Sequence, residues 1–165
     1  MPKFIYCPQC AKQLVERTIE DQSRAACPDL ECGFVHYDNP TPVVAAIVQK
    51  GDDVILVRNI GWPETWFGIV SGFLERGESP EDGVLREVQE EIQVDAKLVE
   101  LVGVYPFERF NQVIMVYHVT IDDEPVANEA ELAAIKHVPI AKLKPWPFGT
   151  GPAVADWLDS QQESH

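Results

Sequence analysis

Three acidic side chains close together on one predicted helix restrict the fold of this 165-residue chain more than any other feature. Glu87, Glu90 and Glu91 stand three and four positions apart, so on an α-helix their carboxylates share one face. Two like charges about 4 Å apart repel by about 4 kcal/mol at the effective dielectric constant of a partly exposed site. The fold must therefore supply positive charge beside this face.

The helix that carries these glutamates is predicted to run from about residue 80 to residue 92. Ser79 is a suitable N-cap, Pro80 suits the first helical position, and the acids at 81 and 82 lie where the helix dipole is positive. Four apolar residues at helical spacing predict a buried face: Val84, Leu85, Val88 and Ile92.

Arg86 can reach Glu90 one turn further on, but one guanidinium cannot neutralise three carboxylates. Mg²⁺ and Mn²⁺ take oxygen ligands and bridge carboxylates to phosphate oxygens, so the cluster predicts a seat for one of these ions. A metal there would let an acidic surface accept a phosphate. On these residues alone, a solvated acidic helix face is the alternative.

The residues before the helix complete a longer pattern. The segment GFLERGESPEDGVLREVQEEIQV, residues 72–94, resembles the Nudix box, G-x5-E-x7-R-E-U-x-E-E-x-G-U, where U is a bulky apolar residue. The matching residues are Gly72, Glu78, Arg86, Glu87, Val88, Glu90, Glu91 and Val94. This resemblance implies a Nudix hydrolase of the α/β class, an α/β/α sandwich with a mixed β-sheet, whose loop–helix–loop binds a divalent metal. It also implies hydrolysis of a nucleoside diphosphate linked to another moiety.

Gln93 departs from this pattern because it stands where the box has glycine. The position lies just past the predicted helix end, where a left-handed backbone costs a residue with a β-carbon about 1 kcal/mol or more. We therefore expect an altered exit loop but an intact set of metal ligands.

The resemblance also implies roles for the acidic cluster. Glu87, Glu90 and Glu91 would hold the metal, with help from the backbone carbonyl of Gly72. A water activated by the metal and by a glutamate would attack a phosphorus of the pyrophosphate.

The remaining charged residues of the box are expected to be structural. Glu78 and Arg86 would hold the loop against the helix rather than touch substrate. The general base is open, because in Nudix enzymes it comes from the box or from a later loop. Glu131 is the first candidate in that loop and Glu129 the second, and Glu131 can equally be a solvated loop acid.

All four cysteines precede residue 33, as C-x2-C at Cys7 and Cys10 and C-x4-C at Cys27 and Cys32. The N-terminus lacks the features of a secretory signal, so we expect a cytoplasmic, reducing environment and thiols or metal rather than disulfides. Four thiolates complete a tetrahedral Zn²⁺ site without an open position, and its folding energy replaces a core that so short a segment cannot build. We therefore predict a structural zinc ribbon over residues 1–37.

A larger domain is predicted over residues 38–165, because two prolines and an asparagine at 39–42 interrupt regular structure. Strands are expected at 43–50 and 54–58, joined by a tight turn, and then at 65–72, 96–105, 112–121 and 134–140. An acidic loop is expected at 122–132 and a closing helix at 151–162. Several strands with two helices predict a mixed sheet covered on both faces.

Charge limits the partners of the protein. The chain has 13 basic and 27 acidic residues, a net charge of −14, and 22 of the acids lie in the larger domain. That sign opposes electrostatic binding to nucleic acid or to an anionic membrane, and no apolar run approaches the roughly 20 residues that cross a bilayer. An anionic substrate therefore needs cations between it and the protein, and neither nucleic acid nor a membrane is expected as a partner.

The order of the two domains bears on the substrate. A zinc ribbon before a Nudix domain resembles the arrangement in NADH pyrophosphatases and in related enzymes that act on FAD or ADP-ribose. Those pyrophosphatases carry S-Q-P-W-P-F-P-x-S not far after the box, where this chain has YPFERFNQ, and PWPF stands instead at 145–148. We therefore expect a broader substrate class, ADP-ribose, FAD or NADH, cleaved to release AMP, and the relatives suggest a homodimer.

Substrate contacts are expected from cations and flat rings outside the box. Candidate phosphate partners are Arg58, Arg76 and Arg109, and the leading candidates for stacking on a base are Phe107 and Phe110. Two other functions stay open: a non-catalytic adaptor that senses nucleotide and uses the zinc ribbon for protein or nucleic-acid contacts, and a hydrolase of nucleotide-capped RNA. The complete glutamate set disfavours the adaptor, and the acidic charge disfavours RNA.

Overall fold

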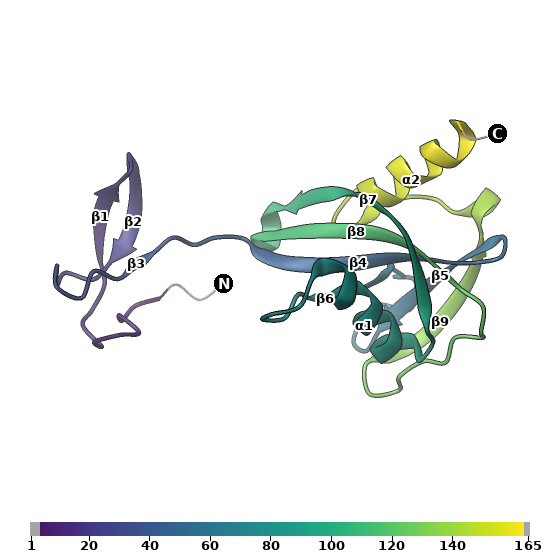
Figure 1. Ribbon diagram of the computed structural model, residues 1–165, viewed down its shortest axis with the longest axis horizontal. Coiled ribbons are helices and arrows are strands. Elements are labelled where there is room, and N and C mark those ends of the chain that lie inside the picture. Colours follow the sequence, from purple (N-terminus) through teal and green to yellow (C-terminus); the bar gives the residue numbers. More distant parts are fainter. Residues whose placement is uncertain (1–3, 164–165) are drawn as a thin grey trace. The chain divides into compact units, whose positions relative to one another are not determined.

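The chain divides between Pro40 and Thr41 into two units in a computed structural model that describes residues 4–163 (Figure 1). The first unit holds the four cysteines and the second holds the acidic helix. Each unit has its own sheet, so each is described by itself.

The first unit is a three-stranded antiparallel sheet of β1 (Val15–Ile19), β2 (Gln22–Ala26) and β3 (Val35–His36). A two-residue turn joins β1 to β2, and both of its residues, Glu20 and Asp21, have positive φ angles. Such turns match the right-handed twist of the flanking strands. Among the described residues of this unit, only Cys7, Ala26 and Cys27 are buried, so the sheet has almost no apolar core.

The second unit is built on a six-stranded sheet in the order β7-β8-β4-β5-β9, with β6 paired to β4. The pairing of β4 with β8 is parallel and the other pairings are antiparallel, so the sheet is mixed. The strands are β4 (Thr41–Lys50), β5 (Asp53–Asn59), β6 (Val70–Phe73), β7 (Ala96–Phe107), β8 (Gln112–Ile121) and β9 (Leu132–Pro139).

Two helices cover the two faces of this sheet, as the ribbon shows (Figure 1). Alternate residues of β4 divide between two buried cores: Val44, Ala46 and Val48 pack with α1 (Pro80–Ile92), whereas Val43, Ala45 and Ile47 pack with α2 (Gly151–Glu163). We call these faces the α1 face and the α2 face. The predicted α/β/α sandwich with a mixed sheet is confirmed.

The observed elements agree with the predicted ones except between β5 and β6. A strand was expected over 65–72, but β6 begins only at Val70. Before it, Trp66 donates its backbone N–H to Pro63 in a turn, and Gly68 forms a single bridge with Val57. Two short 3-10 helices, η1 (Glu108–Phe110) and η2 (Ile140–Lys142), complete the unit. Among the helices that the structure describes, none is long and apolar enough to cross a membrane.

Candidate active site

The ends of α1 follow from local sequence. Ser79 caps the helix, since its side-chain oxygen accepts the backbone N–H of Asp82 at 3.1 Å, and Pro80 occupies the first helical position. At the other end Gln93 has φ 56° and ψ 36°, the left-handed conformation expected where the box has glycine. Its backbone N–H donates to the carbonyl of Gln89, and its side chain donates to the carbonyl of Ala127 at 3.3 Å.

Arg86 fixes the loop that precedes the helix. Its Nε and Nη2 donate to the two carboxylate oxygens of Glu78 at 3.1 and 2.7 Å, and Nη2 also donates to the carbonyl of Phe73 at 3.0 Å. Glu78 in turn accepts the backbone N–H of Glu75 at 2.6 Å. The Arg86 guanidinium lowers the pKa of Glu78 to about 2, so this pair is charged at neutral pH.

The same guanidinium also contacts the acidic cluster. Nη1 of Arg86 donates to Glu87 at 2.7 Å and to Glu90 at 3.0 Å, so the predicted reach to Glu90 is confirmed. These bonds compensate two of the three glutamates of the cluster. The third, Glu91, has no cation within 4.0 Å among the described residues.

Glu91 is the most buried of the three, with 4% of its surface exposed. Its Oε1 accepts the backbone N–H of Ser71 on β6 at 3.4 Å, and its Oε2 is buried with no hydrogen-bond partner. Burial raises the pKa of Glu91 to about 8, and the charges of Glu87 and Glu131 act in the same direction. A buried oxygen without a partner is rare, and an ion bound by the carboxylate is one explanation for it.

Glu87 lies against the glycine that begins the box. A β-carbon added to Gly72 would overlap the carboxylate of Glu87, so only glycine lets this carboxylate sit over the strand. Burial raises the pKa of Glu87, whereas Arg86 opposes that shift. Glu87 and Glu91, two partly desolvated carboxylates, therefore both lie against β6, at Gly72 and at Ser71.

These donors fit a divalent cation. They are hard oxygen ligands, one of them has an unpartnered buried oxygen, and the missing side chain of Gly72 lets the Glu87 carboxylate approach the strand closely. The carboxylates are not drawn into one tight group, because Arg86 holds Glu87 and Glu90. In the described part of the chain, the four cysteines alone form a group of three or more ligands with such close spacing.

The loop between β8 and β9 reaches the end of α1. Asn128 donates its backbone N–H to the carbonyl of Glu91, and Ile60 donates its own to the carbonyl of Glu131. Glu131 is exposed, and its charge raises the pKa of both Glu87 and Glu91, which indicates that it lies near them. Glu129 is also exposed.

The other predicted substrate residues fall into separate places. Phe107 and Phe110 pack edge to face with ring centroids 5.0 Å apart, and the guanidinium of Arg109 lies 5.6 Å from the Phe110 ring, so the fold groups these three. Arg58 is half-buried on β5 and Arg76 is exposed in the loop before α1. Within residues 4–163, no hydrogen bond, ion pair or ring contact joins either arginine to the aromatic group.

Two residues of β6 were missed from the sequence. Ser71 supplies the N–H that binds Glu91, and a backbone group leaves no sequence signal. Phe73 directly follows Gly72 and has 59% of its surface exposed, which is unusual for a large ring. Its position in the sequence, an apolar residue at the end of a strand and directly after the box glycine, could have indicated that Phe73 lies at the site.

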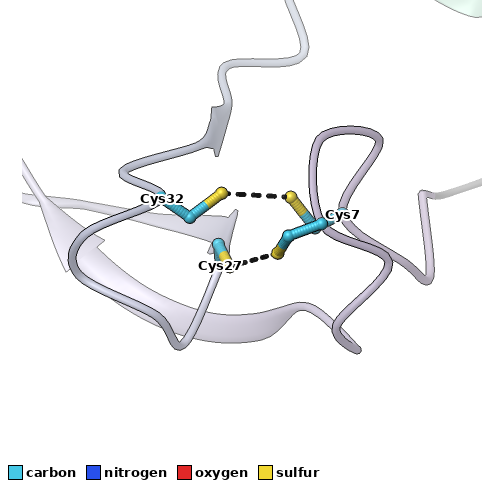
Figure 2. A group of neighbouring side chains, drawn as sticks. Cys7, Cys27 and Cys32 are labelled. Atoms are coloured by element: carbon cyan, nitrogen blue, oxygen red, sulfur yellow. Dashed lines mark hydrogen bonds between the residues drawn. The ribbon is translucent and has the colours of Figure 1, made fainter.

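The cysteine cluster of the first unit is compact (Figure 2). The sulfur atoms of Cys7, Cys10, Cys27 and Cys32 all lie within 4.8 Å of one another, with Cys7 to Cys32 at 3.6 Å and Cys10 to Cys27 at 3.5 Å. Zinc–sulfur bonds of about 2.3 Å in a tetrahedron require sulfur separations of about 3.8 Å. The cysteines therefore have the donor set and the spacing of a zinc site.

Similarity to known proteins agrees with this geometry. The NUDIX domain family model matches residues 39–157. The NAD-capped RNA hydrolase NudC of Pseudomonas aeruginosa is 28% identical over 144 residues, which are 86% of this chain and 50% of that protein. NudC of Stutzerimonas stutzeri is 35% identical over 91 residues, 54% of this chain and 31% of that protein. The chain spans about half the length, or less, of these relatives.

Solved structures share the fold. A NUDIX hydrolase from Nitrosomonas europaea has a TM-score of 0.81 and 23% identity, with 98% of this chain and 94% of that chain covered. An ADP-ribose pyrophosphatase from Streptococcus suis has a TM-score of 0.62 and 17% identity, with 77% and 96% covered. With the family model matched over most of its length, this chain belongs to the Nudix family.

Proposed function

We propose that the protein is a divalent-metal-dependent pyrophosphohydrolase that cleaves a nucleoside diphosphate linked to another moiety. The observation that carries the proposal is the pairing of Glu91, buried with an unpartnered oxygen, with Glu87, which lies over Gly72. Two such carboxylates are unfavourable without a cation. The family match and the relatives named as hydrolases support the same reaction class.

Glu87, Glu90, Glu91 and the carbonyl of Gly72 would hold Mg²⁺ or Mn²⁺. When bound, the ion supplies positive charge for the phosphoryl oxygens and lowers the pKa of a coordinated water. Glu131 is exposed and its charge acts on Glu87 and Glu91, which supports Glu131 as the group that would accept the proton of the attacking water.

Arg86 and Glu78 act on the ligands rather than on substrate. Two hydrogen bonds join the guanidinium to Glu78, and a third ties it to the carbonyl of Phe73. Arg86 therefore stays in place when Glu87 and Glu90 turn from it toward a metal. It also lowers the repulsion between these carboxylates before the metal binds.

We expect ADP-ribose, FAD or NADH as substrates, with AMP as a product. Phe107 and Phe110 would stack on a base, Arg109 would contact a phosphate beside them, and Arg58 and Arg76 would add positive charge. The relatives named NAD-capped RNA hydrolase favour an NAD-like group at the scissile end.

A second candidate substrate is NAD-capped RNA, favoured by the names of the same relatives. Against it, the net charge of −14 opposes the approach of a polyanion. The small dinucleotide therefore stays the first proposal. A non-catalytic adaptor is a weaker proposal, because the glutamate set is complete.

The first unit is proposed to be a structural Zn²⁺ site, since four thiolates fill a tetrahedron and the unit has almost no apolar core. The division into a ribbon at 1–37 and a hydrolase domain at 38–165, the homodimer and the cytoplasmic location remain predictions.

A substrate panel tests the proposal. Purified protein with Mg²⁺ or Mn²⁺ is incubated with ADP-ribose, FAD, NADH, diadenosine tetraphosphate and NAD-capped RNA, and AMP or uncapped RNA is quantified. We expect metal-dependent AMP release from at least one small substrate and loss of turnover in Glu91→Gln. Equal turnover in wild type and Glu91→Gln would contradict the assignment of the site.

A further inference from the structure

The α2 face of the sheet carries two cations that no acidic residue neutralises. Leu56 of β5 pairs with Lys136 of β9, and Arg58 pairs with Ala134. Leu56 belongs to the core of the α2 face, and side chains two positions apart on a strand share a face. Arg58 and Lys136 therefore lie on that face as diagonal neighbours across two strands.

Neither cation has an acidic partner within 4.0 Å in the described part of the chain. Lys50 and Lys97, by contrast, pair with Glu124 and Asp122. Nε of Arg58 is buried and lacks any hydrogen-bond partner. The buried Nε of Arg58 without a partner, with the charge of Lys136 on the same face, points to an anionic ligand.

Aromatic rings border these cations. Nζ of Lys136 lies 5.4 Å from the centre of the Phe67 ring. The bridge between Val57 and Gly68 brings the next residues along each chain, Arg58 and Phe67, alongside one another.

The rings continue away from Phe67 into a second segment. Trp66 contacts Phe148 from the loop before α2, with ring centroids 6.3 Å apart, and each has 54% of its surface exposed. Exposed flat rings next to unpaired cations match a nucleotide, which offers a heteroaromatic base and a phosphate.

We propose that Arg58, Lys136, Phe67, Trp66 and Phe148 form a nucleotide-binding subsite on the α2 face, which takes the base and phosphate of one half of a small dinucleotide substrate. This inference rests on the proposed function, because it names where part of that substrate binds. The cations hold the phosphate, and Trp66 and Phe148 stack on the base. The subsite uses none of the glutamates of α1.

AMP is the probe, because it has the base and the phosphate but no bond to hydrolyse. Its dissociation constant is measured by calorimetry for wild type, Arg58→Gln, Lys136→Ala and Phe148→Ala. Lys142→Ala is the matched control, since Lys142 is another exposed lysine without an acidic partner. We expect each subsite variant to weaken AMP binding by about tenfold, as for the loss of one charge-assisted hydrogen bond or one stacked base.

Tryptophan fluorescence gives a second readout. Stacking of AMP on Trp66 should quench its emission, and Trp66→Phe should keep the affinity within about threefold while most of the quench disappears. A quench that persists in Trp66→Phe, or AMP affinity unchanged in Arg58→Gln, Lys136→Ala and Phe148→Ala, would overturn the subsite.

The experiment separates this inference from the proposed reaction. If no substrate is hydrolysed but AMP binding shows this pattern, the reaction is wrong and the subsite stands. Hydrolysis with AMP binding insensitive to the subsite variants overturns the subsite alone. An uncapped adenylate hexamer tests the other occupant: stronger binding of the hexamer than of AMP, lost in Lys136→Ala, would show an RNA surface and overturn the assignment to a small dinucleotide.

Discussion

The carboxylate of Glu87 lies directly over Gly72, in the space that a β-carbon at that position would fill. The first residue of the box and the first glutamate of the cluster are therefore fitted to each other. One close approach of α1 to β6 therefore sets the position of the Glu87 carboxylate.

Gly72→Ala should remove activity without unfolding the protein. The new β-carbon displaces the end of a flexible glutamate side chain, not backbone, so the stability cost is small, but Glu87 must leave its position over Gly72. We expect turnover to fall by about tenfold or more, as for a misplaced catalytic group. The control is Gly68→Ala, where a β-carbon would make ordinary contact with Trp62 at 3.4 Å. Equal activity of the two variants would contradict this role.

The contribution of Glu91 to the stability of the metal-free protein should fall as pH rises from about 4.5 to about 8. Folded Glu91 keeps its proton up to a pKa of about 8, whereas the unfolded chain releases it near 4.5, so the folded state binds more protons in this range. Denaturant unfolding at several pH values, without Mg²⁺ or Mn²⁺, measures the slope. Glu91→Gln should reduce the slope of unfolding free energy against pH and leave the part of it that comes from Glu87. A slope identical to that of wild type would be evidence that Glu91 is not a buried titrating group.

Arg86→Lys should lower both stability and turnover, although it keeps the charge. A lysine cannot reproduce the two bonds to Glu78 together with those to Phe73 and Glu87. We expect the unfolding midpoint to drop by several degrees and KM for the metal to rise. Thermal unfolding and metal titrations of activity measure the two effects, with Arg76→Lys, an exposed arginine of the loop before α1, as the control.

Glu131→Gln should act on kcat. If Glu131 accepts the proton of the attacking water, its loss lowers kcat by about 10²–10⁴ and leaves the affinity for metal little changed. Glu129→Gln, in the same exposed loop, should behave as wild type. A loss of kcat in Glu129→Gln alone would instead transfer the role to Glu129.

Cys10→Ser should remove zinc without removing hydrolysis. The four cysteines lie in the first unit, and both cores of the second unit are formed without them. Mass spectrometry of metals should find one zinc per chain in wild type and little in the variant. Loss of Mg²⁺-dependent turnover in a variant whose second unit remains folded would show that zinc does more than support the first unit.

The elements with strong local signals could be predicted from sequence. The cap at Ser79, Pro80 and the apolar stripe defined α1 because each acts within one or two turns. The start of β6 could not be predicted, because Trp66 and Phe67 have strand propensity but lie in a segment where a turn and a single bridge at Gly68 replace the sheet.

The sequence predicted which residues form the site, but not which of its carboxylates are buried. The spacing in the sequence grouped Glu87, Glu90 and Glu91 on one helix face. It did not show that Glu91 is the buried one, because Glu91 is covered by β6, where it meets Ser71 only through tertiary packing. In the same way, the fold brings Phe148 to Trp66, although 81 residues of chain separate them. Such contacts between distant segments leave no periodic signal in the sequence.

The most direct measurement is anomalous diffraction from crystals soaked in Mn²⁺ together with a slowly hydrolysed nucleotide. We expect a manganese peak bonded to Glu87 and Glu91 and to phosphate oxygens of the nucleotide. Density for the nucleotide without an ion beside these two carboxylates would contradict it.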